Sequence, residues 1–85
     1  MASRKHAMTR EIALTVIQAA MDGWQKSLPF REWSRQDILN HFRGNSVWHE
    51  PYALYFEDWA IVVKDRRSSV GAQVSYQEAL TGVLS

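Results

Sequence analysis

The strongest constraint on the fold is an apolar seam near the start of the chain. Its residues recur at spacings of 3, 4, 3 and 4: Leu14, Ile17, Met21, Trp24 and Leu28. This spacing is that of one face of an α-helix. Alanines beside the seam widen the apolar face beyond what one small neighbour needs. We therefore expect part of it, namely Leu14, Ile17, Met21 and Trp24, to mediate self-association, with the aromatic segment of residues 48–59 as the alternative.

The predicted first helix runs over residues 9–27. Thr9 is a good N-cap, and Glu11 falls in the first turn, where an acid complements the helix dipole. Gly23 costs a helix about 1 kcal/mol relative to alanine and is the expected place of a kink or an early end. The helix is the most firmly indicated element of the chain.

Length and composition limit what can surround this helix. Eighty-five residues make one domain, with residues 1–8 expected as a flexible basic tail and 9–85 as the globular part. The 46% hydrophobic and 22% charged residues are typical of a globular protein. The chain has no cysteine, which removes disulfides, thiolate metal sites and a thiol nucleophile. Small folds without such staples often oligomerise, so a homo-oligomer is expected.

Two further helices are expected, each opened by a capping box in which a serine precedes an acid by three residues. One covers Arg35–Arg43, with Gly44 and Asn45 as the stop, and the other covers Tyr76–Val83. A short strand or hairpin before the last helix is the alternative. It is suggested by apolar residues that alternate with polar or small ones: Val70, Ala72, Val74 and Tyr76.

Residues 48–59 hold five of the ten aromatic residues of the chain, and the only charges among them are acidic. From Pro51 two structures compete. The 3/4 spacing of the apolar residues favours a helix over Pro51–Asp65, whereas the run Trp59–Val63 is rich in strand-forming residues. We predict the helix. The expected fold is mainly α, a small single-domain bundle of about four helices, with an α+β fold as the alternative.

The aromatic segment is also the candidate binding site. Phe56 and Trp59 are expected in the core. The predicted partner-binding residues are three rings and two acids: Trp48, Tyr52, Tyr55, Glu57 and Asp58. Interface cores are enriched in such rings, and the acids favour a partner protein with a basic surface.

Charge and hydropathy exclude several classes of protein. Ten Lys and Arg against nine Asp and Glu give a net charge of +1, without the basic excess usual in nucleic-acid-binding domains. The longest uncharged apolar run, Ala60–Val63, is too short to cross a bilayer. The first residues lack the apolar stretch of a secretory signal. A cytoplasmic protein without membrane contact is expected.

No catalytic or cofactor signature is present. The histidines, His6, His41 and His49, do not have the spacing of metal ligands. There is no G-x-S-x-G motif and no glycine-rich phosphate loop. Glu57 and Asp58 are sequence neighbours that would point apart on a helix. We expect neither an enzyme nor a bound metal or cofactor.

A small helix-turn-helix-like DNA-binding regulator is the alternative function. Ser34 to Phe42 resembles a first helix, and Gly44 could provide the turn. The recognition helix would then begin near Glu50 and Pro51, where no side chain suited to base edges is present. Arg4–Lys5 and Arg66–Arg67 are the remaining candidates for phosphate contact, so direct DNA binding is the less favoured function.

In length, lack of cysteine, near-neutral charge and mixed aromatic and acidic segment, the chain resembles small temperate-phage regulators of the antirepressor type. The resemblance is one of general character and transfers no functional residue. It implies a protein that binds a phage repressor, commonly as a homo-oligomer. The expected function is thus a non-enzymatic inhibitor that binds and neutralises another protein involved in transcription regulation.

Overall fold

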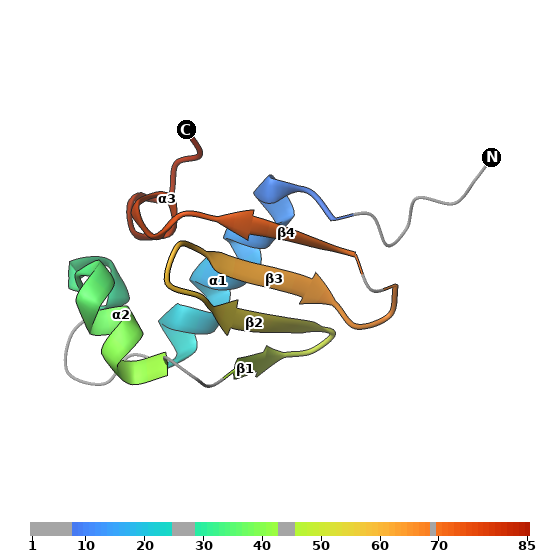
Figure 1. The fold of residues 1–85 in the computed structure, drawn as a ribbon, viewed down its shortest axis with the longest axis horizontal. Helices are drawn as coiled ribbons and strands as arrows, with labels where there is room; N and C mark the ends of the chain where they lie inside the picture. Colours follow the sequence, from blue (N-terminus) through green and yellow to red (C-terminus); the bar gives the residue numbers. More distant parts are fainter. Residues whose placement is uncertain (1–7, 25–28, 43–45, 69) are drawn as a thin grey trace.

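The computed structural model describes residues 8–24, 29–42, 46–68 and 70–85. Its elements in chain order are α1 (Arg10–Trp24), the 3₁₀ turn η1 (Phe30–Glu32), α2 (Arg35–Phe42), β1 (Ser46–His49), β2 (Tyr52–Phe56), β3 (Ile61–Asp65), β4 (Gly71–Val74) and α3 (Tyr76–Thr81). Figure 1 shows the strands as one sheet with α1 behind it and with α2 and α3 towards one end. The fold is therefore α+β.

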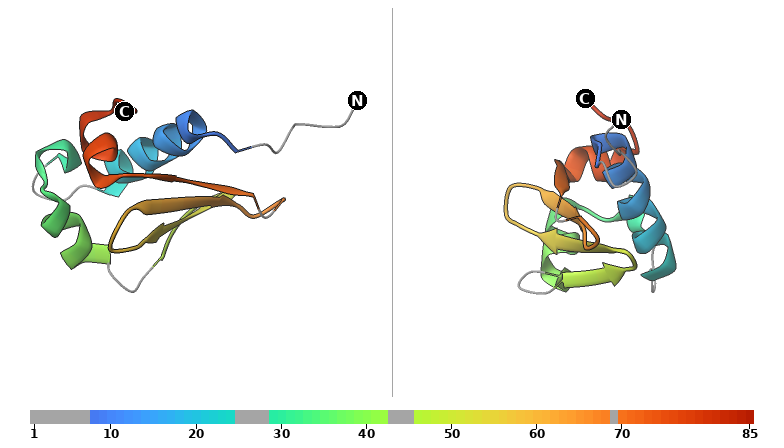
Figure 2. Two further views of the ribbon diagram at one scale, coloured as in Figure 1. Left: turned by 45° about the horizontal axis from the view of Figure 1, so that its top comes forward. Right: turned by 90° about the vertical axis from the view of Figure 1, so that its right-hand side faces the viewer.

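The sheet is an antiparallel meander in the order β1-β2-β3-β4. In its central hairpin Leu54 pairs with Val63 and Phe56 pairs with Ile61. The β1–β2 turn contains a cis peptide bond between Glu50 and Pro51. The two views of Figure 2 show that α1 lies along one face of the sheet, while the other face is open. The sheet thus has a covered face and an outer face.

The covered face and α1 form the centre of the core, to which η1, α2 and α3 also contribute buried residues. Four strand residues on this face are fully buried: Leu54, Ile61, Val63 and Val74. The helix contributes six buried residues: Ala13, Leu14, Val16, Ile17, Ala20 and Met21. Fully burying a side chain such as leucine or valine stabilises a fold by about 1.5–3 kcal/mol. The predicted first helix is confirmed over Arg10–Trp24, and its predicted end lies in residues 25–28, outside the described residues.

The predicted bundle of about four helices is wrong, and the chain is not the helical protein that was expected. The error lies in residues 51–65, which form β2, a hairpin and β3 instead of one helix. Pro51 stands in the β1–β2 turn rather than at a helix start. Paired as strands, alternate residues of the segment all face α1: Leu54, Phe56, Ile61 and Val63. Because β-branched and aromatic side chains fit a pleated, half-buried surface, the apolar face of α1 selects the strands.

The capping boxes are confirmed. At α2 the Asp37 amide donates to the Ser34 hydroxyl at 3.1 Å, and the Ser34 amide donates to the Asp37 carboxylate at 2.8 Å. The same reciprocal pair joins Ser75 and Glu78 at the start of α3. The short strand suggested before the last helix is also present, as β4. The predicted stop at Gly44 and Asn45 lies outside the described residues.

An aromatic cluster joins α1 and α2 at one end of the core. Trp24 meets Trp33 edge-on with ring centroids 5.6 Å apart, and Phe42 stacks on Phe56 at 4.6 Å. The exposed His41 ring stacks on Trp33 at 4.9 Å. Aromatic rings therefore close this end of the core. They do not cover the outer face of the sheet.

Within the described residues no helix is both long and apolar enough to cross a membrane.

Candidate binding face of the sheet

The outer face is built by the strand residues that alternate with the core residues. Two rows of paired residues cross it. The first row runs Ser46, Tyr55, Val62, Gln73, and the second runs Trp48, Ala53, Lys64, Gly71. Side chains opposite one another in such rows lie about 4.5–5.5 Å apart at their Cβ atoms. Tyr55 and Val62 are half-buried, whereas Trp48 is 54% exposed. Apolar surface therefore continues across the open face.

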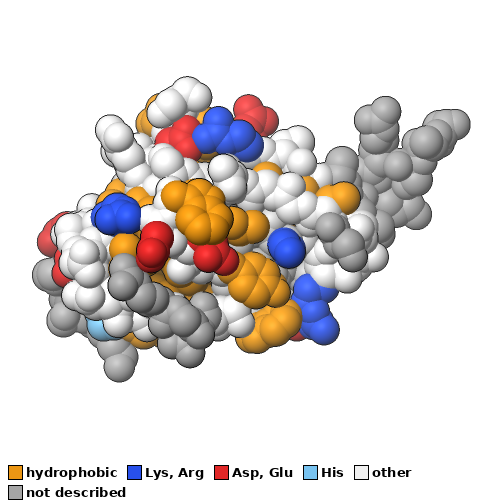
Figure 3. Space-filling model, in the orientation of Figure 1, with side chains coloured by type: hydrophobic (Ala, Val, Ile, Leu, Met, Phe, Trp, Pro, Cys, Tyr) orange, Lys and Arg blue, Asp and Glu red, His pale blue; other side chains and the backbone are white. Residues whose placement is uncertain are grey.

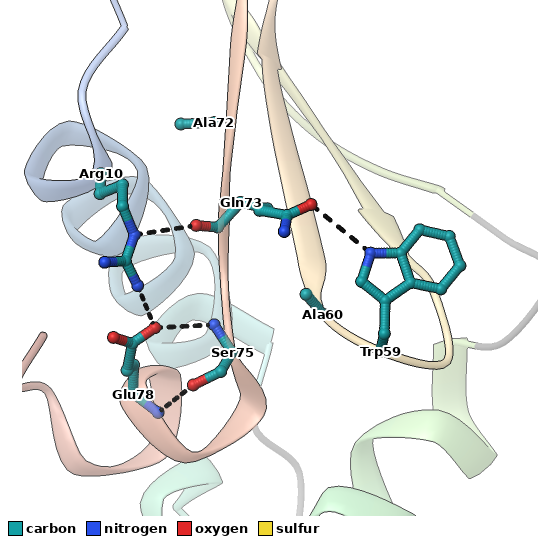
Figure 4. A pocket seen from close by; sticks show the side chains of 7 residues that line it. All are labelled: Arg10, Trp59, Ala60, Ala72, Gln73, Ser75 and Glu78. Atoms are coloured by element: carbon teal, nitrogen blue, oxygen red, sulfur yellow. Dashed lines mark hydrogen bonds and ion pairs between the residues drawn. The ribbon is translucent and has the colours of Figure 1, made fainter. Parts of the chain in front are cut away.

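Trp59 stands over this face from the β2–β3 hairpin. The hairpin is closed by the Glu57 amide, which donates to the Ala60 carbonyl at 3.0 Å. The side chain of Trp59 is 64% exposed, and its indole Nε1–H lies 3.5 Å from the Gln73 Oε1 on β4 (Figure 4). The hairpin thus places a large ring beside the rows of the outer face, with one weak polar contact to orient it.

The indole of Trp59 separates two hollows. The first, of about 260 Å³, lies over β2 and β3 and is lined by Tyr55, Glu57, Trp59, Val62 and Lys64. The second, of about 350 Å³, lies at the edge of β4 and is shown in Figure 4, lined by Arg10, Trp59, Ala60, Ala72, Gln73, Ser75 and Glu78. Their shared wall makes Trp59 the central feature of this side of the molecule.

Both acidic and basic side chains lie beside the aromatic rings of the outer face. Lys64 places its ammonium 5.7 Å from the Tyr55 ring centroid. Arg66 lies 4.7 Å over the Trp48 ring and forms an ion pair with Glu50 at 2.7 Å. Figure 3 shows hydrophobic side chains gathered over the sheet, with acidic and basic groups spaced around them. The outer face is therefore an apolar patch with a mixed charged rim, a composition common in protein interfaces.

Glu78 lines the second hollow, and its carboxylate already has hydrogen-bond and ion-pair partners within the chain. Its carboxylate accepts hydrogen bonds from the Ser85 and Ser75 amides and pairs with Arg10. These contacts lower the pKa of Glu78 from its ordinary 4.5 to about 2, with the two amides contributing before Arg10. Arg10 also donates from Nε to the Gln73 carbonyl at 3.3 Å. The group ties α1, β4 and α3 together, a structural role.

The structure places four of the five predicted partner-binding residues on the outer face or in the β2–β3 hairpin beside it. Trp48 and Tyr55 lie on the outer face, Glu57 lines the hollow beside Trp59, and the exposed Asp58 sits in the same hairpin. Tyr52 lies apart from them. It pairs with Asp65 on the covered side of the sheet and lines a different hollow, with Glu11, Ile12, Thr15 and Val16.

The residues predicted for self-association are core residues. Leu14, Ile17 and Met21 are buried between α1 and the sheet. Trp24 is half-buried against the rings of Trp33, His41 and Phe42. A second copy that used this face would have to displace the contacts that hold α1 to its own sheet.

The sequence-based hypothesis missed Trp59 as a surface residue. Phe56 is buried as expected, but Trp59 was assigned to the core with it and is the more exposed of the two outer-face tryptophans. On a helix, the rings of Phe56 and Trp59 would lie on the same side. In the structure Phe56 ends β2 and faces the core, whereas Trp59 lies in the hairpin and is exposed. The available signal was the acidic pair Glu57–Asp58, which interrupts two strand-like runs where a hairpin turn would be.

The helix-turn-helix geometry is not formed by the described residues. The segment that would supply the recognition helix forms β1, the turn at Pro51 and β2. The part of the chain that the structure describes also contains no group of three or more His, Cys, Asp or Glu placed to hold a metal ion.

No protein-family model matches the chain, and neither a curated protein nor a solved structure matches it.

Proposed function

We propose that the chain is a non-enzymatic binding protein that docks a partner protein on the outer face of its sheet. The observation that carries the proposal is Trp59, 64% exposed between two hollows. Trp48, 54% exposed, continues the apolar surface on β1. Hot spots of protein interfaces favour tryptophan and tyrosine that fill or flank pockets. A contiguous exposed apolar patch rimmed by polar groups is typical of an interaction site.

The charges of the rim indicate what the partner surface carries. Glu57 and Asp58 lie beside Trp59 at the hairpin, whereas Lys64 and Arg66 lie towards the other end of β3. The complementary surface has an apolar centre, basic groups opposite the hairpin and acidic groups opposite Lys64. Such complementarity governs specificity and the rate of association more than affinity.

For the identity of the partner we propose a transcriptional repressor, the class implied by the resemblance to antirepressors. A DNA-binding protein carries a basic face, and the acids of the hairpin would oppose it. The chain would then act by occupying the repressor surface that DNA requires. Added to a repressor–operator complex, it should release the operator, and Trp59→Ala should release much less.

The docking proposal is tested by quantitative affinity capture with three baits: the unaltered chain, Trp59→Ala and Ile12→Ala. Ile12 is the matched control, since it is an exposed apolar residue on α1, away from the outer face. The expected result is a protein recovered stoichiometrically by the unaltered chain and by Ile12→Ala, and depleted at least tenfold with Trp59→Ala. Equal recovery by all three baits would show that the outer face is not the docking site.

Single-stranded nucleic acid is the second candidate, favoured by one observation: exposed rings share the face with Lys64 and Arg66. Bases stack on such rings, and cations attract the backbone. Titrating an oligothymidylate while following tryptophan fluorescence tests it. Quenching that weakens steeply as salt rises supports this candidate, because phosphate contacts release counterions. No quenching at low salt removes it.

A further inference from the structure

The two edges of the sheet differ in the hydrogen-bond partners of their outward backbone N–H and C=O groups. The Arg66 amide donates to the Pro51 carbonyl, and the Glu57 amide donates to the Ala60 carbonyl, each at 3.0 Å. In an antiparallel sheet, residues alternate between bonding to one neighbour and bonding to the other. Odd-numbered residues of β2 therefore bond to β3, and Tyr52 and Leu54 bond to β1.

On β1 the partners of Tyr52 and Leu54 are His49 and Val47. The backbone N–H and C=O groups of Ser46 and Trp48 consequently point away from the sheet. At the opposite edge, the Gln73 carbonyl of β4 already accepts from Arg10. In Figure 1 no described element lies beyond β1. The β1 edge thus presents the outward backbone groups of both Ser46 and Trp48, whereas on the β4 edge Arg10 already occupies one outward carbonyl.

We propose that two copies of the chain associate through their β1 strands, antiparallel about a two-fold axis at Val47, into one continuous sheet. In this register the outward groups of Ser46 meet those of Trp48 of the second copy, and the reverse. The arrangement is self-complementary, as a two-fold interface must be. The net charge of +1 on each chain gives little repulsion.

Side-chain size supports this register. The small Ser46 is paired with the large Tyr55 of β2, whereas the large Trp48 is paired with the small Ala53 of β2. Pairing of two β1 strands places the Trp48 indole of the second copy over the small Ser46, next to the Tyr55 ring. The ring, 54% exposed in the single chain, is then covered on the side of the free edge. A second copy fits this edge because each large residue meets a small one.

The proposal does not require the docking function, although the two share Trp48 and dimerisation would join two outer faces into one surface. The two can fail separately, because Trp59 lies in the β2–β3 hairpin and not on β1. Trp59→Ala should leave the dimer unchanged. A partner captured by a monomeric chain would support docking and count against the dimer.

The test uses the absence of cysteine from the sequence. Val47→Cys places two thiols on the two-fold axis in a non-hydrogen-bonded pair, where Cα atoms are about 4.5 Å apart, within the range of a disulfide. Ser46→Cys is the matched control, because each Ser46 faces Trp48 rather than its own counterpart. After mild oxidation, non-reducing electrophoresis should show a covalent dimer for Val47→Cys and at least fivefold less for Ser46→Cys. The opposite ratio, or none for either, overturns the register.

Analytical ultracentrifugation supplies the second measurement. The unaltered chain should sediment at twice the monomer mass, and a monomer at every concentration overturns the proposal. Trp48→Ala keeps the outward N–H and should weaken the dimer about tenfold or less, whereas Trp48→Pro removes that N–H and should weaken it further. Proline is tolerated where a strand N–H faces away from its sheet, and an unchanged circular dichroism spectrum verifies the fold. Equal dimerisation by the proline and alanine variants overturns pairing through the backbone.

Discussion

The two faces of the sheet are made by the same strands and are both apolar, yet only one is covered. On the face towards α1, Leu54 and Val63 are fully buried. On the other face, their neighbours Tyr55 and Val62 are half-buried, and Trp48 and Trp59 are largely exposed. The comparison separates rings that hold the fold from rings that are available to bind. Burial, rather than residue type, marks the difference.

The largest expected effect comes from a matched pair of adjacent valines. Val63→Ala empties space in the core and should lower the free energy of unfolding by about 2–3 kcal/mol, through lost burial and a cavity. Val62→Ala makes the same change on the outer face and should cost under about 1 kcal/mol. The loss of strand propensity is common to both variants. Urea unfolding measures the two values.

Equal costs for Val62→Ala and Val63→Ala would mean that the outer face is covered in solution by something that contributes as much as α1. Dilution would then separate the two explanations. A cost at Val62 that disappears at low protein concentration indicates a second copy, whereas a cost that persists contradicts the openness of the face.

The open outer face also explains how far the sequence could predict the fold. The helical seam, both capping boxes and the strand near Val74 follow from local spacing and were predictable. Residues 51–65 were not, because their outward residues are nearly as apolar as their inward ones: Tyr55, Trp59 and Val62 against Leu54, Phe56, Ile61 and Val63. A strand with one polar face would have shown clear alternation. Here the apolar residues also satisfied the helical 3/4 spacing.

The predicted partner-binding residues lie on different faces of the sheet because the segment forms strands instead of a helix. Trp48 and Tyr55, both predicted to bind a partner, fall on the same outer face of the sheet. Tyr52 was expected beside Tyr55 on one side of a helix. The two are three positions apart, and an odd spacing in a strand puts side chains on opposite faces. The position of Trp59 depends on the hairpin, which spacing alone does not fix.

A second prediction compares a buried carboxylate in an ion pair with an exposed one. Glu78 is buried, paired with Arg10 and bonded to two amides, whereas the Glu50–Arg66 pair is exposed. Glu78→Gln should destabilise the protein clearly at pH 7. Glu50→Gln should change stability little, because solvent screens an exposed pair. Unfolding midpoints in urea provide the comparison.

Acid should reduce the effect of Glu78→Gln. The pKa of Glu78 is about 2 in the folded chain, below its ordinary 4.5, so its contribution is complete above about pH 4.5 and is lost as the pH falls towards 2. The difference in stability between the unaltered chain and Glu78→Gln should therefore be smaller at pH 3 than at pH 7. A difference that stays constant over this range would show that the charge of Glu78 does not stabilise the fold.

The smallest expected effect on stability belongs to the most exposed ring, that of Trp59. Trp59→Ala removes a side chain whose one polar contact with the described residues, to Gln73, spans a long 3.5 Å, and which is 64% exposed. The free energy of unfolding should change by about 0.5 kcal/mol or less, as for an ordinary surface substitution. Truncating an interface hot spot costs about 2 kcal/mol or more of binding free energy. Trp59→Ala should therefore cost much more in partner binding than in unfolding. Low cost in unfolding together with lost capture of the partner assigns Trp59 to binding. A cost of about 3 kcal/mol in unfolding would instead assign it to the fold, and would remove the difference between the two faces.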